Sequence, residues 1–123
     1  MASSPTLSSR TNFGLAREAM ALFGVKNGYG TETAAGTVTL DTTYPSVLGI
    51  DPGGAGRDVT LDAEATAEGM WRFIVNKADA AETLTVKDDG GSTIATVTQN
   101  KAALLHCNGT AWSLACLFTV TLS

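Results

Sequence analysis

Charged residues are scarce in this sequence of 123 residues, at 16% against roughly 25% in an ordinary soluble domain. The length corresponds to one domain, and 44% hydrophobic residues are enough for a core. Low charge together with 13 glycines and many threonines fits a β-rich chain whose surfaces are partly hidden, for example by self-association.

Cysteine, histidine and long apolar runs are also rare, and each shortage excludes a class of protein. The 2 cysteines cannot staple a small secreted domain or build a four-ligand zinc site. The 1 histidine argues against a His-rich metal centre. No apolar run approaches the ~20 residues that cross a bilayer. We therefore expect no cofactor, no metal site and no membrane partner.

Charge is unevenly distributed around the net value of −4. Residues 1–30 carry three basic and one acidic side chain, whereas residues 31–123 carry five basic and eleven acidic ones. An acidic body argues against nucleic acid as a partner, because Lys and Arg must neutralise phosphates. The polar start, followed by a short apolar stretch after Glu18, does not fit a secretory signal. We expect synthesis in the cytoplasm.

The first 36 residues are predicted to form an extended arm that carries one short helix over residues 13–23. Asn12 is suited to the helix N-cap and Gly24 to its end. The apolar face contains Phe13, Leu15, Ala16, Ala19, Met20, Leu22 and Phe23, and Arg17 points away from it. So short a helix needs something to pack against, either its own domain or another subunit or partner. Fully extended, the arm could reach on the order of 100 Å.

From residue 37 onward the hydrophobic period changes to two, which predicts a β domain over residues 37–123. Segments 37–41, 57–62, 70–76, 84–88 and 93–98 alternate as half-buried strands. In 70–76 the alternation places Trp71, Phe73 and Val75 on one side. The Asp-Asp-Gly-Gly-Ser run at 88–92 predicts a hairpin, and the Gly-rich run at 51–56 predicts a turn.

The end of the chain has the clearest alternation of all. Its apolar positions are Trp112, Leu114, Cys116, Phe118, Val120 and Leu122. Asn108-Gly109 predicts the two-residue hairpin that precedes this strand. The final strand leaves an edge that must be paired or covered. These patterns predict an all-β fold, an antiparallel β-sandwich or barrel, with Trp71, Phe73, Trp112, Leu114 and Phe118 in the core or a trimer interface.

Catalytic chemistry is not evident, and we expect no enzyme and no catalytic residues. A two-residue turn at 108–109 would place Cys116 opposite Lys101, far from Cys107, so we expect buried free thiols. His106 and Cys107 are neighbours on a strand and point to opposite faces. The acidic residues are expected to be solvated, and the Gly-rich run lacks the Lys-Ser/Thr of a phosphate loop.

Three blocks of the sequence resemble small virion proteins of tailed bacteriophages. They are 57–79, 84–97 and the Cys-Asn-Gly-Thr-Ala-Trp run at 107–112, and similar strings occur in head decoration (cement) proteins and in tail-fibre and spike modules. Where the family usually has Asp-Gly-Thr-x-Trp, this chain has Asn108. The resemblance implies a β-structured protein of the capsid surface, made in the bacterial cytoplasm, that binds the major capsid protein as a homotrimer.

Two functions therefore stay open at the level of sequence. In a decoration protein that stabilises the head, β faces form the homotrimer and the arm anchors capsid or subunit through Phe13, Leu15, Arg17, Met20, Leu22 and Phe23. In a tail-fibre or spike module, loops 51–56 and 88–92 contact a host-surface glycan or receptor. The role of the arm distinguishes the two.

Overall fold

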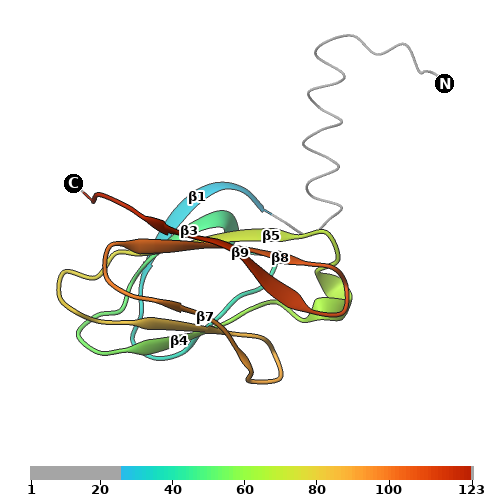
Figure 1. Cartoon of the computed structure of the whole chain (residues 1–123), viewed down its shortest axis with the longest axis horizontal. Helices are drawn as coiled ribbons and strands as arrows, with labels where there is room; N and C mark the ends of the chain where they lie inside the picture. Colours follow the sequence, from blue (N-terminus) through green and yellow to red (C-terminus); the bar gives the residue numbers. More distant parts are fainter. Residues whose placement is uncertain (1–25, 123) are drawn as a thin grey trace, which may run out of the picture.

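Two β-sheets face each other in the computed structural model, which describes residues 26–122 (Figure 1). The sequence-predicted helix over 13–23 and its candidate anchoring residues lie outside the described residues. The first strand begins at Lys26, so the β body starts earlier than the boundary at residue 37 that the sequence predicts.

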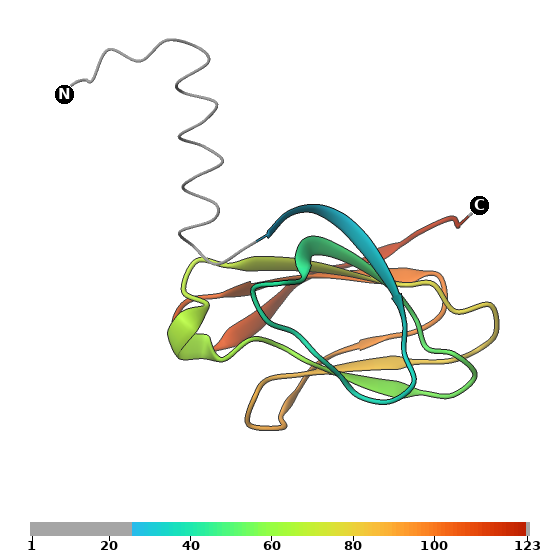
Figure 2. The same ribbon diagram turned by 180° about the vertical axis from the view of Figure 1, so that it is seen from behind.

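One sheet has five strands and the other has four, and all are short. The five-stranded sheet contains, in spatial order, β1 (Lys26–Thr33), β3 (Pro45–Asp51), β5 (Trp71–Asn76), β8 (Lys101–Cys107) and β9 (Trp112–Thr119). The four-stranded sheet contains β2 (Val38–Thr39), β4 (Arg57–Thr60), β6 (Leu84–Lys87) and β7 (Thr93–Val97). The helix among the described residues is the 3-10 turn η1 (Glu64–Thr66), which closes one end between the sheets (Figure 2).

The strands from β1 to β6 alternate between the two sheets, so the chain winds in coils rather than hairpins. β1, β3 and β5 pair in parallel, as do β2, β4 and β6. Antiparallel pairing occurs between β5, β8 and β9 and between β6 and β7. The predicted β-rich class is confirmed, but the antiparallel arrangement and the barrel are wrong: both sheets are mixed and neither closes.

The sequence could not reveal this pairing because side chains alternate with period two in both kinds of sheet. The coils also differ in length. Leu48 pairs with Gly30 and with Ile74, so successive coils are offset by 18 and 26 residues. Unequal coils leave no repeat in the sequence, and each parallel crossover runs through a strand of the opposite sheet instead of a helix.

Both predicted hairpins are present, with one change of register. The 88–92 turn joins β6 to β7, and the Asp88 backbone N–H donates to the Ser92 carbonyl at 2.9 Å. The second hairpin has a four-residue loop, 108–111, in place of two residues, so Cys107 pairs with Trp112. The Asn108 Oδ1 accepts hydrogen bonds from the backbone of Thr110 and Ala111, each at 2.9 Å. This side-chain-capped turn explains the longer loop.

The core lies between the sheets and draws aliphatic side chains from both. Its large members are Leu48, Ile50, Val59, Leu61, Met70, Ile74, Leu84, Val86, Val97, Leu105 and Trp112. Trp112 donates its indole N–H to the Asp62 carbonyl at 2.8 Å, which satisfies the polar atom of this buried ring.

Arg72 is fully buried in this core, and hydrogen bonds satisfy all five of its N–H donors. Two go to the carboxylate of Asp62, from Nε at 3.0 Å and from Nη2 at 2.9 Å. The remaining three reach the backbone carbonyls of Tyr44, Pro45 and Asp41 at 3.1, 2.7 and 2.7 Å. One side chain of β5 thereby fixes the β2–β3 connection and the segment that follows β4.

Asn76, at the far end of β5, likewise holds neighbouring backbone segments in place through hydrogen bonds of its side chain. It is fully buried, and its Nδ2 donates to the carbonyls of Glu82 and Val97 at 2.9 and 2.8 Å. Its Oδ1 accepts the Ala78 backbone N–H at 2.8 Å. The inward side of β5 thus has a polar residue at each end of Ile74.

We predict that Arg72→Met lowers the free energy of unfolding by about 3–5 kcal/mol, because it leaves the Asp62 carboxylate buried without its charge partner. Urea denaturation measures the change. The matched control is Arg57→Met, since the half-buried Arg57 donates Nε to a single carbonyl, that of Pro52; a cost of about 1 kcal/mol is expected there. Equal stability of both variants would contradict the importance of the network.

The turn between β3 and β4 needs glycine at Gly53 for two reasons. Its φ is +75°, and a Cβ there would lie 2.6 Å from the backbone oxygen of Ala34. Gly54 has φ +101° but open space around the Cβ position. We predict that Gly53→Ala destabilises more than Gly54→Ala, by about 1 kcal/mol or more, because only the first adds a backbone clash to the cost of the left-handed conformation. Paired thermal denaturation curves test the difference.

Candidate interaction surface

The outer face of the five-stranded sheet, the side turned away from the four-stranded sheet, is apolar and uncovered by the described residues. Residues that pair across the sheet share a face, and Trp71 pairs with His106 while Phe73 pairs with Leu104. Arg72 and Ile74 alternate with Trp71 and Phe73 along β5; they point inward and are fully buried. Trp71 is 49% exposed. A sheet face in contact with water is usually polar, so this face is exceptional.

Aromatic rings pair along this face, and charge is missing from its centre. The Trp71 and His106 rings have centroids 5.1 Å apart, and those of Phe73 and Phe118 are 5.7 Å apart. The outward positions of β5, β8 and β9 are Trp71, Phe73, Val75, Ala102, Leu104, His106, Ser113, Cys116 and Phe118. None of these is Asp, Glu, Lys or Arg, which is the composition of an interface core rather than of a solvated surface.

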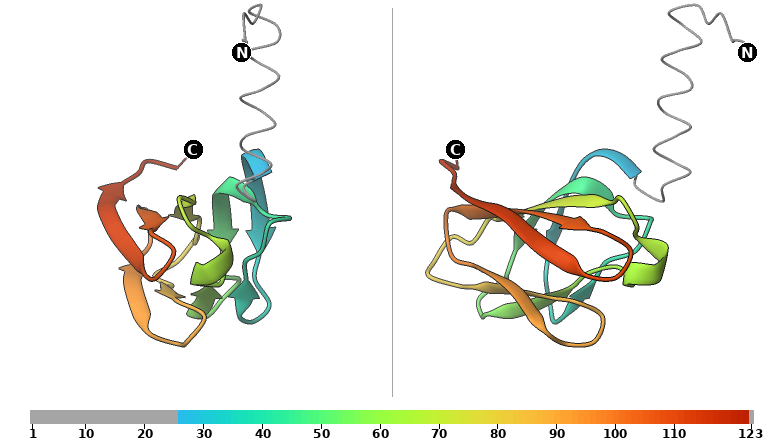
Figure 3. Two further views of the ribbon diagram at one scale, coloured as in Figure 1. Left: turned by 90° about the vertical axis from the view of Figure 1, so that its right-hand side faces the viewer. Right: turned by 45° about the vertical axis from the view of Figure 1, so that its right-hand side comes forward.

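Strand β9 is the margin of this sheet (Figure 3), and apolar side chains extend from both of its sides. A β-bulge explains why. Leu105 pairs with Leu114 and Leu104 with Cys116, which leaves Ala115 without an opposite residue. The bulge shifts the alternation by one, so Leu114 and Leu117 lie on the inward side and Cys116 and Phe118 on the outward side. The single apolar face predicted for this strand is wrong for that reason.

The residues assigned by sequence to the core or a trimer interface thus separate into two groups. Trp112 lies in the core. Trp71, Leu114 and Phe118 are exposed, and Phe73 is half-buried on the outer face. Sequence reasoning missed Leu117, which is 44% exposed, because the bulge that reverses its side has no signal in the residue pattern.

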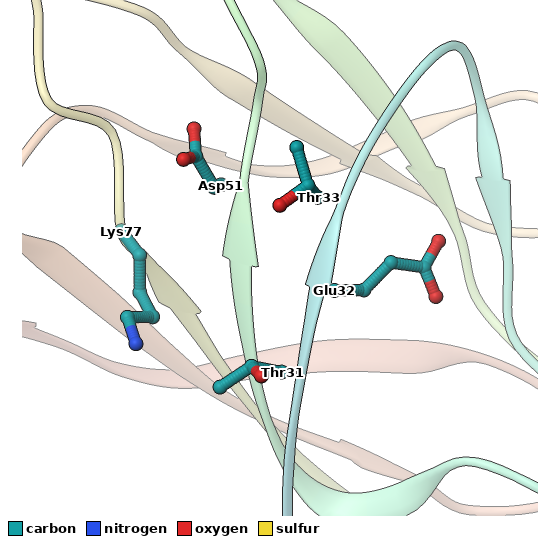
Figure 4. Close-up of a pocket in the computed structure, with 5 residues that line it drawn as sticks. All are labelled: Thr31, Glu32, Thr33, Asp51 and Lys77. Atoms are coloured by element: carbon teal, nitrogen blue, oxygen red, sulfur yellow. The ribbon is translucent and has the colours of Figure 1, made fainter.

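At the opposite margin, the ring of Tyr29 on β1 covers Gly49. A Cβ at Gly49 would lie 2.8 Å from the Tyr29 hydroxyl and 2.6 Å from Cδ of Lys77, so a larger residue there would displace the ends of these two side chains. A shallow polar pocket lies beside this contact, lined by Thr31, Glu32, Thr33, Asp51 and Lys77 (Figure 4). Its side chains are of mixed charge and come from the edge strand β1, from the end of β3 and from the residue after β5. Glu32 points away from Lys77.

Carboxylates gather at two places in the described part of the chain. Asp51, Asp79 and Glu82 form one group, and Glu64, Asp88 and Asp89 form the other, with ligand oxygens within 4.8 Å of one another in each. Each group of three carboxylates could contribute ligands to a cation, but Ca²⁺ needs 6–8 oxygens, more than one oxygen from each of three residues supplies. In the second group, a hydrogen bond with Asp89 raises the pKa of Glu64 above its ordinary 4.5, and the charges of Asp89 and Asp88 act in the same direction.

The two cysteines are free, as predicted, but only Cys107 is buried and Cys116 is exposed. Burial raises the pKa of the Cys107 thiol above its ordinary 9.0, which disfavours the reactive thiolate. Cys107 belongs to the core, and its neighbour His106 stacks on Trp71 at the outer face. The two side chains are therefore separated by the sheet.

Family models, curated proteins and solved structures provide no match to this chain. Within residues 26–122, no helix is both long enough and apolar enough to cross a membrane.

We predict that the contribution of Glu64 to stability falls as the pH rises through the range in which this residue loses its proton. Because the pKa of Glu64 is raised in the folded protein, the native state holds this proton to a higher pH than the unfolded chain does. The stabilising effect is complete below about 4.5 and is lost above the raised pKa. Glu64→Gln should flatten this part of the profile of melting temperature against pH, and an unchanged slope would contradict the carboxyl contact.

Proposed function

We propose that the protein is a structural virion protein of a tailed bacteriophage that binds the assembled capsid surface and stabilises the head as a homotrimer. The observation that carries the proposal is the uncharged, aromatic outer face beside the exposed strand β9. A surface of this kind is expected where a protein is completed by other subunits. The sequence resemblance to head decoration proteins supplies the class of assembly.

Stabilisation of a shell requires no chemistry beyond binding. A protein that binds the assembled head but not its separated subunits shifts the equilibrium toward the assembled state, by an amount that grows with its concentration over the dissociation constant. A trimer multiplies this effect, because three weak contacts to neighbouring capsid subunits act together once one has formed. The β body serves as a rigid centre and the arm as the contact to the major capsid protein.

A tail-fibre or spike module is the alternative function, with loops 51–56 and 88–92 as contacts to a glycan or receptor. Both loops use polar groups internally. Asp51 Oδ1 accepts the Gly53 N–H at 3.0 Å, and Asp88 Oδ1 accepts those of Gly90 and Ser92 at 3.0 and 2.8 Å. These groups are therefore occupied in turn formation, which favours decoration over ligand binding.

Imaging of undecorated expanded heads mixed with the purified full chain tests the proposal. We predict discrete density at capsomer junctions and a raised temperature of head disruption. A Met20→Asp/Phe23→Asp variant should lose head binding, because it places charge on the apolar side of the predicted arm helix. Ser9→Asp in the same arm is the control. Heads that remain bare with the unaltered protein would refute the decoration function.

A further inference from the structure

We propose that the exposed surface around β9 is the contact between copies of this chain, which meet around a common axis beside this strand. The β9 surface consists of Trp71, Leu104, Leu114, Cys116, Leu117 and Phe118. The inference rests on the proposed function and specifies the self-association within it. The proposed occupant of the β9 surface is a second copy of this chain, and the alternative occupant is the arm of the same chain.

Electrostatics favours a second copy at this place. Residues 31–123 carry an excess of acidic over basic side chains, so two β bodies repel each other over most of their surface. None of the six residues of the β9 surface is charged. Copies can therefore approach with the least repulsion where these surfaces meet, and around a common axis each copy contacts both of its neighbours beside β9.

The available area is consistent with a specific interface. Trp71, Leu114, Leu117, Phe118 and Leu122, just beyond the strand, keep 49%, 40%, 44%, 39% and 37% of their surface in water. Together they offer on the order of 400 Å² of largely apolar area. A standard interface buries about 800 Å² per partner, of which somewhat more than half is apolar. The β9 surface with a polar rim meets that requirement.

The two-sided exposure of β9 argues against the arm of the same chain as the occupant. The arm joins β1, which lies four strand spacings, about 19 Å, from β9 across the sheet. A helix over 13–23 would be about 16 Å long, so together with its linker it could span that distance. The deciding feature is that Leu114 and Leu117 lie on the opposite side of β9 from Phe118. A helix on the outer face cannot cover both sides, whereas a neighbouring copy at the strand edge contacts both.

Sedimentation velocity and light scattering on the full chain test the inference. We expect a mass of more than one chain at micromolar concentration, and association roughly a hundredfold weaker in Phe118→Asp, because a charge would be buried at the contact. Leu117→Asp probes the other side of β9. The matched control is Thr96→Asp, because Thr96 is an exposed residue of β7; this variant should associate as the unaltered protein does. Circular dichroism establishes that each variant is folded.

A short bismaleimide provides an independent readout, since Cys116 is the exposed cysteine and Cys107 is buried. We expect a cross-linked product of two chains that is lost in Cys116→Ser and weakened in Phe118→Asp. A monomeric unaltered protein would overturn the inference. If Met20→Asp/Phe23→Asp then associates, the arm of the same chain covers the surface. Self-association through β9 without binding to heads would leave this inference standing and refute the decoration function instead.

Discussion

The hydrogen bonds of Arg72 determine which side of the five-stranded sheet becomes the inside. On β5, polar and apolar residues alternate so that Arg72, Ile74 and Asn76 point inward while Trp71, Phe73 and Val75 point outward. Hydrophobicity alone would favour the reverse, because the outward set is the more apolar. In the observed orientation the guanidinium binds three backbone carbonyls and the carboxylate of Asp62. The reverse orientation would leave that buried carboxylate without its partner.

This arrangement also fixes register. A slip of one residue in β5 would exchange its two faces and would remove the bidentate Arg72–Asp62 pair together with the three contacts of Asn76. A buried ion pair is weak evidence for extra stability, since desolvation offsets much of its attraction. Its effect here is selectivity between two orientations of one strand. The uncovered aromatic face is thus the consequence of a core that requires Arg72, and the fold leaves Trp71 and Phe73 for contacts outside the β body.

The sequence predicts most strands but not their partners, and it misses two strands of the five-stranded sheet: β1 falls in the predicted arm, and β3 is not predicted as a strand. Alternation in 57–62, 70–76 and 84–88 identifies β4, β5 and β6. Glycine with Asp or Asn identifies the turn at 88–92 and the place, but not the length, of the turn that begins at Asn108. Alternation does not distinguish parallel from antiparallel neighbours, nor the inward from the outward side of a strand. Trp71 and Phe73 appear as core candidates for that reason, whereas the buried Arg72 has no sequence signal. The bulge at Ala115 arises from pairing with β8, so no pattern within 112–122 could reveal it.

Edge strands of natural sheets are commonly protected by charged residues, proline or a covering segment. Strand β9 has none of these among Trp112–Thr119: it contains no charged residue and no proline. Its bulge twists the strand locally and so gives partial protection, but it also exposes Leu117 on one side and Phe118 on the other. A strand that has one unpaired edge and these properties is prone to indiscriminate association. The proposed contact between copies would seal the strand edge and so remove this hazard, and the same residues would then serve both solubility and assembly.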